Sequence, residues 1–290
     1  MNGEWDRQDL TELLTLEPIG ERSWRSYVSE ANTNGRIFGG QLLGQALWAA
    51  ARTANGRCPA MLQMTFLKGA RPQEALEYSI DALQDGRRLA TRHIYAVQGT
   101  GMILSANASF QSLPEQPAVP QQWAQPLADP QSLPDLEQLA ARYGSDTNEL
   151  QARWQARAFL DIRPVAAQEY LERRPSHSQV AHWMRLKPAL GSKGALHHAA
   201  LAYMSDAWLH ACMAPTLGLL QLWQECYCSS LNHSLWFHQP HIDANDWLLF
   251  VCDWVPGAAG RHLITAHIYR RDGVRVASMA QDVLVSPRGG

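Results

Sequence analysis

The feature that most constrains this chain is an order of elements that occurs twice, on either side of a proline-rich stretch. Residues 38–50 (FGGQLLGQALWAA) are apolar on nearly every helical face, and residues 199–209 (AALAYMSDAWL) have the same character. A helix that is apolar all round is expected inside other structure. Downstream, residues 89–95 can be laid over residues 263–269. This repeated order predicts a duplicated chain.

The segments that follow each helix are typical of antiparallel hairpins. The turns Gln98-Gly99 and Asp272-Gly273 fall in register in the overlay, and the residues around them are rich in Val, Ile, Leu and Tyr. Such residues favour strands, and short turns that contain glycine join antiparallel pairs. We therefore predict an α+β fold in which a long antiparallel sheet curls around one buried helix, and this unit is made twice.

Between the two halves lies a connection that cannot sustain a helix or a central strand over its first part. Its prolines are Pro114, Pro117, Pro120, Pro126, Pro130 and Pro134, and proline removes a backbone donor and fixes φ. Good helix formers in an amphipathic pattern follow from Asp135 to Phe159. The predicted organisation is an N-terminal domain over residues 1–113, a linker with a connecting helix over 114–160, and a C-terminal domain over 161–290.

Charge and composition exclude several classes of partner. With 25 basic and 27 acidic residues and a net charge of -2, the chain gives no electrostatic reason to expect nucleic acid or an anionic membrane. The N-terminus is polar, and no apolar run is long enough to span a bilayer, so we expect a cytoplasmic protein. The 5 cysteines are irregularly spaced, and Cys226-x-Cys228 lacks a second pair, so neither a disulfide framework nor a metal site is predicted.

Several motifs, in this order, carry a resemblance to a known family. They are Phe38-Gly39-Gly40-Gln41-Leu42-Leu43-Gly44-Gln45-Ala46-Leu47, Arg163-Pro164-Val165, Tyr203-Met204-Ser205-Asp206, Asn232-His233-Ser234-Leu235-Trp236-Phe237-His238 and Val276-Ala277-Ser278-Met279-Ala280-Gln281-Asp282. From about Leu14 to Val285 the chain resembles the type II acyl-CoA thioesterases, which are double hot-dog proteins. The resemblance implies a tandem hot-dog fold with one continuous sheet and hydrolysis of acyl-CoA, or of an acyl-carrier-protein thioester, without a cofactor. It also implies a homodimer or homotetramer.

The resemblance further implies that a catalytic water lies between Asp206, Ser230 and Gln281. The family commonly has Thr where this chain has Ser230, which keeps the hydroxyl but loosens its rotamer. Members often carry a His in the strand after the first helix, where this chain has Gln63, so we assign that position no catalytic role.

Asp206 also stands out without the family, because it is the only acid in a helix whose neighbours indicate burial. Burying a carboxylate costs several kcal/mol unless it is paired or hydrogen-bonded. We predict that Asp206 is the general base, that Ser230 and Gln281 orient the water or the base, and that backbone N–H groups at the start of one central helix stabilise the oxyanion. Which of the two helices does so is not readable from the sequence.

Alternative roles stay open at this stage. Asp206 can attack the carbonyl itself to form an anhydride. Ser230 is a weaker candidate nucleophile, since no G-x-S-x-G elbow occurs, and His233 and His238 are expected to bond backbone or face solvent. At the level of function, the alternatives are an acyl-thioester-binding protein without turnover and an enoyl-CoA hydratase-like protein, for which a paired Asp and His is expected.

The internal repeat predicts which half is active. The overlay places Gln45 opposite Asp206, Pro59 opposite Ser230 and Asn107 opposite Gln281, so the first half lacks an ionisable base. The second half is therefore predicted to carry the active site. Gly39, Gly40 and Gly44 match no phosphate-binding motif, and we expect them to allow strands to pack closely on the helix. Trp183, Trp208, Trp236 and Trp247 are candidates to line an acyl tunnel, although most tryptophans are expected in the core.

Overall fold

The computed structural model describes residues 3–113, 121–123, 128–143, 157–167, 179–191, 194–213 and 225–288. Much of the predicted connection, residues 114–120, 124–127 and 144–156, lies outside the described residues, and with it the prolines 114, 117, 120 and 126. Of the helix expected from Asp135 to Phe159, the start is confirmed as helix α3 (Leu136–Tyr143), whereas the last residues, 157–159, form a turn.

Each half contributes one long helix and a run of strands. The first half contains β1 (Gly3–Glu4), α1 (Leu10–Leu14), β2 (Glu17–Gly20), β3 (Ser23–Arg25), β4 (Val28–Ser29), α2 (Gly39–Arg52), β5 (Cys58–Phe66), β6 (Glu77–Asp85), β7 (Leu89–Gln98) and β8 (Gly101–Gln111). After the short helix η1 (Pro130–Ser132) and α3, the second half contains β9 (Leu160–Pro164), β10 (Gln179–Leu186), α6 (Gly194–Ala207), η3 (Leu209–Met213), β11 (Cys226–Ser230), β12 (Asn232–Phe237), β13 (Leu248–Pro256), η4 (Ala258–Gly260), β14 (Arg261–Arg270) and β15 (Arg275–Pro287).

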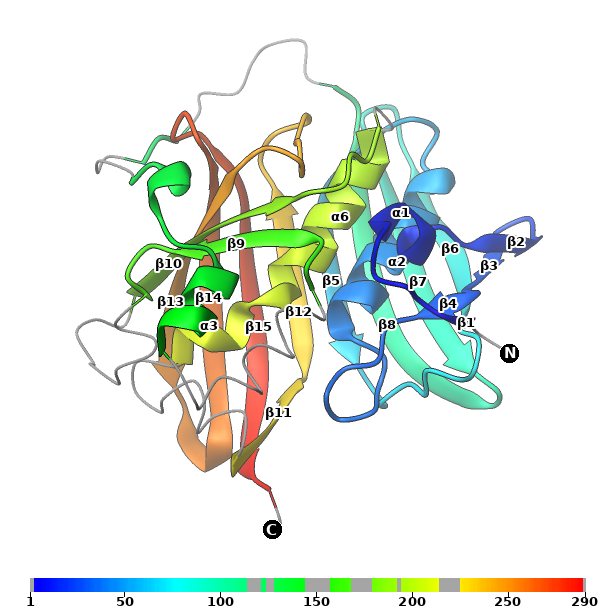
Figure 1. The fold of residues 1–290 in the computed structure, drawn as a ribbon. Helices are drawn as coiled ribbons and strands as arrows, with labels where there is room; N and C mark the ends of the chain where they lie inside the picture. Colours follow the sequence, from blue (N-terminus) through cyan, green and yellow to red (C-terminus); the bar gives the residue numbers. More distant parts are fainter. Residues whose placement is uncertain are drawn as a thin grey trace.

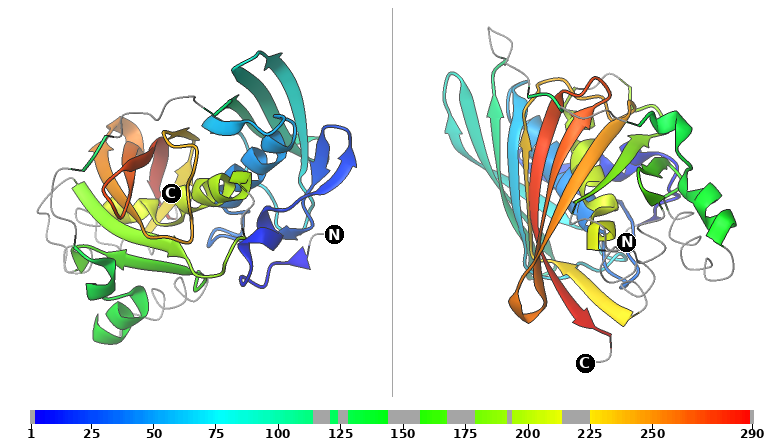
Figure 2. Two further views of the ribbon diagram at one scale, coloured as in Figure 1. Left: turned by 90° about the horizontal axis from the view of Figure 1, so that it is seen from above. Right: turned by 90° about the vertical axis from the view of Figure 1, so that its left-hand side faces the viewer.

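Within the described residues, 13 strands form one sheet in the order β2-β3-β6-β7-β8-β5-β12-β15-β14-β13-β10-β9, with β11 paired to β15. The halves join where β5 and β12 pair antiparallel, with Leu62 opposite Leu235. Both leucines are fully buried. Figure 2 shows the strands as one curved layer with α2 and α6 on its concave side. The predicted α+β tandem fold with a continuous sheet is confirmed.

The two predicted hairpins are β7–β8 and β14–β15, and both are antiparallel. Their turns contain Gly99 at φ 56° and Gly273 at φ 83°, a left-handed conformation that favours glycine. Burial alternates in step along β7 and β14, where Ala90 and Ile264 are buried while Leu89 and Leu263 are exposed. The overlay of these two strands is therefore correct in face as well as in sequence.

Helices α2 and α6 pack directly on each other in antiparallel directions (Figure 1). A Cβ added at Gly40 would lie 2.6 Å from the backbone oxygen of Tyr203, and one added at Gly44 would lie 3.0 Å from that of Ala199. The expectation that these glycines bring strands close to the helix is wrong. Gly40 and Gly44 instead let the two helices approach each other. Both helices are apolar all round and must be buried, and each offers the other an apolar surface.

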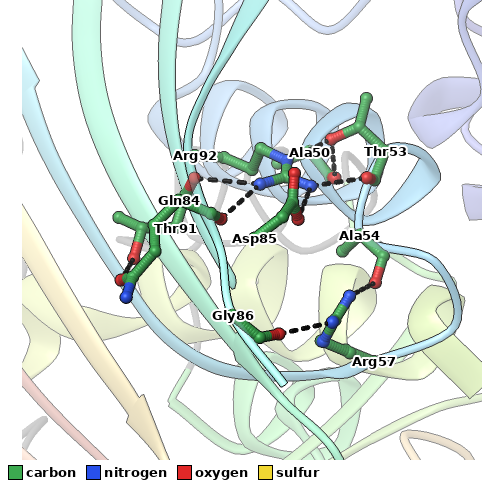
Figure 3. Close-up of polar contacts among 9 residues, drawn as sticks. All are labelled: Ala50, Thr53, Ala54, Arg57, Gln84, Asp85, Gly86, Thr91 and Arg92. Carbon is green, nitrogen blue, oxygen red and sulfur yellow. Dashed lines mark hydrogen bonds and ion pairs between the residues drawn. The ribbon is translucent and has the colours of Figure 1, made fainter. Parts of the chain in front are cut away.

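The carboxyl end of α2 is held by a buried arginine of the sheet (Figure 3). The Arg92 side chain, 1% exposed, donates from Nη2 to the backbone oxygen of Thr53 at 2.7 Å and from Nε to the Thr53 hydroxyl at 2.8 Å. It also bonds the backbone oxygen of Gln84 and the carboxylate of Asp85. A cation at a helix C-terminus satisfies carbonyl groups that the helix itself leaves unpaired.

The described parts of the connection lie on the second half of the sheet. Trp123 packs edge-on against Tyr269 at 5.2 Å, and the backbone oxygen of Ala128 accepts a hydrogen bond from the Trp183 indole at 3.0 Å. These residues belong to a cluster separate from the main core, made of Trp183, Trp247, Leu249, Val251 and Tyr269 with Trp123 and Leu133 packed against it. The connection therefore covers apolar residues on the face of the sheet that points away from α6.

Candidate active site

Asp206 lies one residue before the end of α6, at the point where the two halves meet. Its side chain is 5% exposed, and its carboxylate accepts a hydrogen bond from the backbone N–H of Gly40 at the start of α2. A Cβ added at Gly39 would lie 2.7 Å from the Asp206 Oδ2 atom. The glycine pair of the first half thus leaves room for the carboxylate of the second half.

Burial makes this carboxyl group an unusually good proton acceptor. Desolvation raises the pKa of Asp206 from 3.8 to about 7, although the Gln281 side chain, the Arg157 cation and the Gly40 N–H each lower it. Glu30 adds a smaller effect that raises the pKa. A base whose pKa lies near neutral pH can both take up and return a proton during turnover.

Gln281 and Ser230 lie beside this carboxylate. The Gln281 side chain is fully buried on β15 and is hydrogen-bonded to Asp206, and its Nε2 atom donates to the Ser230 Oγ atom at 2.6 Å. Ser230 is half-buried at the end of β11, next to the strand that carries Gln281. The structure therefore brings all three predicted residues together; their catalytic roles stay a prediction.

A charged network that sequence reasoning missed lies on the other side of Asp206. The Tyr203 hydroxyl donates to Glu30 Oε2 at 2.6 Å, and Arg157 forms an ion pair with Glu30 Oε1 at 3.3 Å. The Arg157 guanidinium also stacks 4.1 Å from the ring centroid of Phe38, which precedes α2. No spacing in the sequence links these residues, since they come from the first half, the connection and α6.

The two histidines near Ser230 differ in position. His233 is fully buried: its Nδ1 atom contacts Gln281 Oε1, and its Nε2 atom lies 3.0 Å from Ser205 Oγ. The expectation that it bonds backbone or faces solvent is wrong, because β12 turns this side chain toward α6. His238 is exposed and bonds Ser278, as expected for a solvent-facing side chain.

The predicted pairing of Asn107 with Gln281 is wrong. Ala90 of β7 pairs with Phe110, and its counterpart Ile264 of β14 pairs with Gln281, so Phe110 occupies the equivalent position. Asn107 is exposed on the other face of the sheet. The reason is that the second hairpin is shorter between these positions: 16 residues separate Ile264 from Gln281, whereas 19 separate Ala90 from Phe110, so the overlay is three residues out of register on the returning strand.

The pairing of Pro59 with Ser230 is also wrong, because Ser230 lies on the separate strand β11 and not on β12. Pro59 pairs with Phe110, whereas the residue of β12 next to the Gln281 side chain is His233, and Ser230 pairs with Val283. Gln45 is buried and hydrogen-bonded to the Leu13 backbone oxygen and to the hydroxyl of Tyr78. Its equivalence with Asp206 stays a prediction.

A pocket of about 1230 Å³ opens onto the candidate site, with Gly39, Asp206 and Ser230 in its wall. Apolar side chains line much of the rest, among them Ile37, Leu42, Phe66, Leu136, Leu160 and Ile162. Of the four tryptophans considered for a tunnel, Trp208 lines this pocket, whereas Trp183 and Trp247 belong to the separate cluster and Trp236 is exposed. The space suits a long apolar group with a polar end at Asp206.

Two family models match consecutive parts of the chain. The model of the acyl-CoA thioesterase N-terminal domain matches residues 28–111, and that of the acyl-CoA thioesterase C-terminal domain matches residues 130–285. The chain belongs to the acyl-CoA thioesterase family. The resemblance to type II acyl-CoA thioesterases that the sequence motifs indicated is therefore confirmed.

Individual acyl-CoA thioesterases resemble the chain over nearly its whole length. Acyl-coenzyme A thioesterase 8 of Mus musculus is 29% identical over 98% of this chain and 93% of its own length. Acyl-CoA thioesterase 2 of Haemophilus influenzae is 26% identical over 96% of both. Among solved structures, acyl-CoA thioesterase II TesB2 of Mycobacterium marinum has a TM-score of 0.75 and 28% identity, covering 97% of this chain and 98% of its own.

In this acyl-CoA thioesterase, none of the helices within the described residues is long and apolar enough to cross a membrane.

Proposed function

We propose that the chain hydrolyses acyl-CoA to a free acid and coenzyme A by means of a water held between Asp206, Ser230 and Gln281. The observation that carries this proposal is the Asp206 carboxylate itself. It is buried, it lines the pocket, and within the described residues its Oδ1 atom has no hydrogen-bond partner. A buried acceptor without a partner costs free energy, and a water molecule supplies the missing donor.

In the proposed reaction, Asp206 takes a proton from the water as its oxygen attacks the thioester carbonyl carbon. Phe38, the residue before α2, provides no side-chain cap, so the N–H group of Gly39, which lies beside Asp206, is placed to stabilise the oxyanion that forms. Collapse of this intermediate breaks the carbon–sulfur bond, and the proton held by Asp206 passes to the departing thiolate. Ser230 and Gln281 keep the water and the carboxylate in position.

The direct test is release of free thiol from an acyl-CoA, followed with a thiol reagent. Binding of acyl-CoA without release of thiol would show instead an acyl-binding protein. Conversion of an enoyl-CoA without thiol release would show a hydratase; His233 does not supply the paired Asp and His expected there, since it contacts Gln281 and Ser205.

Attack by water and attack by the Asp206 carboxylate differ in where solvent oxygen first appears. A single turnover in ¹⁸O-water labels the released acid if water attacks the thioester. The anhydride route instead places the label in the Asp206 carboxylate when water attacks the enzyme carbonyl, and mass spectrometry of the peptide detects it. We expect the label in the product alone.

For the carrier, we propose coenzyme A over a carrier protein, because three of the six Lys and Arg residues in the wall of the pocket lie near one another. They are Arg36, Lys68 and Arg288. Arg36 packs on Gly69, next to Lys68, and Arg288 donates to Asn34 Oδ1 at 3.4 Å, two residues before Arg36. Within the described residues none of the three forms an ion pair with an acid, so they are available to the phosphates of the nucleotide.

This choice of carrier predicts a difference between substrates. Arg36→Gln with Lys68→Gln should raise KM for an acyl-CoA more than for the same acyl group on pantetheine, which lacks the nucleotide phosphates. An equal rise for both would place these cations outside the recognition of the carrier. Three further expectations stay proposals: the division into domains 1–113 and 161–290, a homodimer or homotetramer, and a cytoplasmic location. Light scattering tests the oligomeric state.

A further inference from the structure

The Gln281 side chain is held at both ends. Its Nε2 atom donates to Ser230 Oγ at 2.6 Å, and its Oε1 atom contacts His233 Nδ1. The other ring nitrogen, His233 Nε2, lies 3.0 Å from the hydroxyl oxygen of Ser205 on α6. Ser205, His233 and Gln281 are each at most 2% exposed, so solvent does not compete for these contacts.

The protons that each side chain carries determine which group donates and which accepts in each of these hydrogen bonds. The amide nitrogen of Gln281 supplies N–H groups to Ser230 and to Asp206. Its oxygen accepts only, so His233 must present a proton on Nδ1. Burial lowers the pKa of His233 to about 4, which leaves one proton on the ring at neutral pH and makes Nε2 an acceptor. Ser205, whose hydroxyl otherwise donates to the Ala202 backbone oxygen at 2.8 Å, is the donor available to it.

We propose that His233 is a positioning residue which, as the Nδ1–H tautomer accepting from Ser205, fixes the Gln281 amide with its nitrogen toward Asp206 and Ser230. The part of this inference that concerns turnover rests on the proposed function, whereas the tautomer does not. An amide turned the other way would point its oxygen at the Asp206 carboxylate, and two acceptors facing each other repel. His233 prevents that reversal without touching substrate.

Removal of the Nδ1 donor therefore acts on Asp206 through Gln281. When the amide is free to reverse, Asp206 loses an N–H donor and becomes harder to deprotonate. Arg157 and Glu30 act on the carboxylate, and Tyr203 bonds Glu30. Among the described residues, the other titratable or charged groups in the pocket wall are Arg7, Arg36, Lys68, Asp135, Glu137, Asp161, Lys187, His210, Cys226, Tyr227, Cys228 and Arg288. None of them contacts His233 among the described interactions, so a change at His233 leaves them in place.

The test compares His233→Leu and His233→Asn in the full chain, over a range of pH. In His233→Leu we expect kcat to fall by about 10- to 100-fold, with KM nearly unchanged. This range is that of residues which act by orienting a functional side chain, as the hydrogen-bond partners of metal ligands do. The acid limb of kcat/KM should move to higher pH. In His233→Asn, whose side-chain N–H replaces that of Nδ1, we expect the limb to return toward its original position and kcat to recover in part.

His182→Leu is the matched control, because His182 is also buried in the second half but stacks on Phe250 at 5.2 Å and lies outside the site. We expect a lower melting temperature with an unmoved acid limb. The same behaviour in His233→Leu would mean that His233 only fills space, and an Asn variant no better than the Leu variant would rule out the donor role.

Nuclear magnetic resonance of ¹⁵N-histidine-labelled protein tests the tautomer without any substrate. We expect His233 to carry its proton on Nδ1, and a proton on Nε2 would overturn the proposal whether or not the protein turns over acyl-CoA. Failure of the wild-type chain to release thiol would overturn the proposed function alone.

Discussion

At the scale of single residues, the surroundings of Asp206 have opposing effects on its pKa. Desolvation raises the pKa of Asp206 to about 7, while the N–H groups of Gln281 and Gly40 and the Arg157 cation offset part of that rise. A base that was fully paired would have a low pKa and accept protons poorly, and one with no partner would stay protonated. The groups that contact Asp206 keep its pKa between these limits.

Replacing Asp206 by Asn should reduce kcat for acyl-CoA hydrolysis by about 100-fold or more, because an amide has no basic oxygen to take the proton from water. The measurement is steady-state thiol release, with circular dichroism to show that the variant is folded. A variant with wild-type kcat would remove Asp206 from the mechanism.

The pKa of Asp206 also predicts a pH dependence. Since the base works only when deprotonated, kcat/KM should rise as the pH passes through about 7. Because the folded pKa lies above the ordinary value of 3.8, the folded chain binds the proton more tightly, and the free energy of unfolding should fall as the pH rises from about 4 to about 7. Asp206→Asn should lack that contribution, as urea unfolding of both proteins at several pH values can show.

At the scale of elements, the contact between α2 and α6 decides where the site forms. The helices approach closely because Gly40 and Gly44 face the backbone of α6, and this brings the start of α2 to the end of α6. Neither half by itself contains both Asp206 and the N–H group of Gly40 that binds it.

Gly40→Ala should lower the free energy of unfolding by about 1–3 kcal/mol, since its Cβ would lie 2.6 Å from the backbone oxygen of Tyr203 and the helices must shift. The control is Gly194→Ala at the start of α6, where an added Cβ meets nothing within 4 Å. Alanine is a better helix former than glycine, so the control should be neutral or slightly more stable. Equal effects of both changes in thermal unfolding would argue against helix packing as the cause.

The anchor of α2 in the sheet makes a second prediction at this scale. Arg92→Met should lower the free energy of unfolding by about 1–3 kcal/mol, because the partly buried hydrogen bonds to the backbone oxygens of Thr53 and Gln84 lose their donor. Arg25→Met, which breaks an exposed ion pair with Glu77, should cost less than about 1 kcal/mol. Denaturant unfolding of the two variants measures this difference, and a small effect of Arg92→Met would mean that water replaces its contacts.

At the scale of the whole molecule, the continuous sheet joins the halves into one structure. The pairing of β5 with β12 and the packing of α2 on α6 both cross the boundary between them, and both are buried. Elements that share buried contacts of this kind are expected to unfold together.

Leu235→Ala, at the β5–β12 pairing, should therefore destabilise both halves together by about 2–5 kcal/mol. Tryptophan fluorescence and far-ultraviolet circular dichroism should give coincident unfolding transitions in the wild type and in the variant. Two separate transitions would show that the halves are independent domains.

The duplication, the two central helices and the hairpins could be predicted from the sequence, because apolar helices, strand-forming residues and glycine turns are local patterns. Asp206 stood out as a lone acid in an apolar helix, whereas Ser230 and Gln281 were predicted only through the resemblance of the motifs to type II acyl-CoA thioesterases. The sequence could not predict that Phe110 lies at the position equivalent to Gln281, that the Gly40 N–H group of α2 lies beside Asp206, or that Arg157 and His233 lie near the candidate residues. Sheet register, turn length and helix packing bring residues from distant segments together, and no short stretch of sequence encodes such distances.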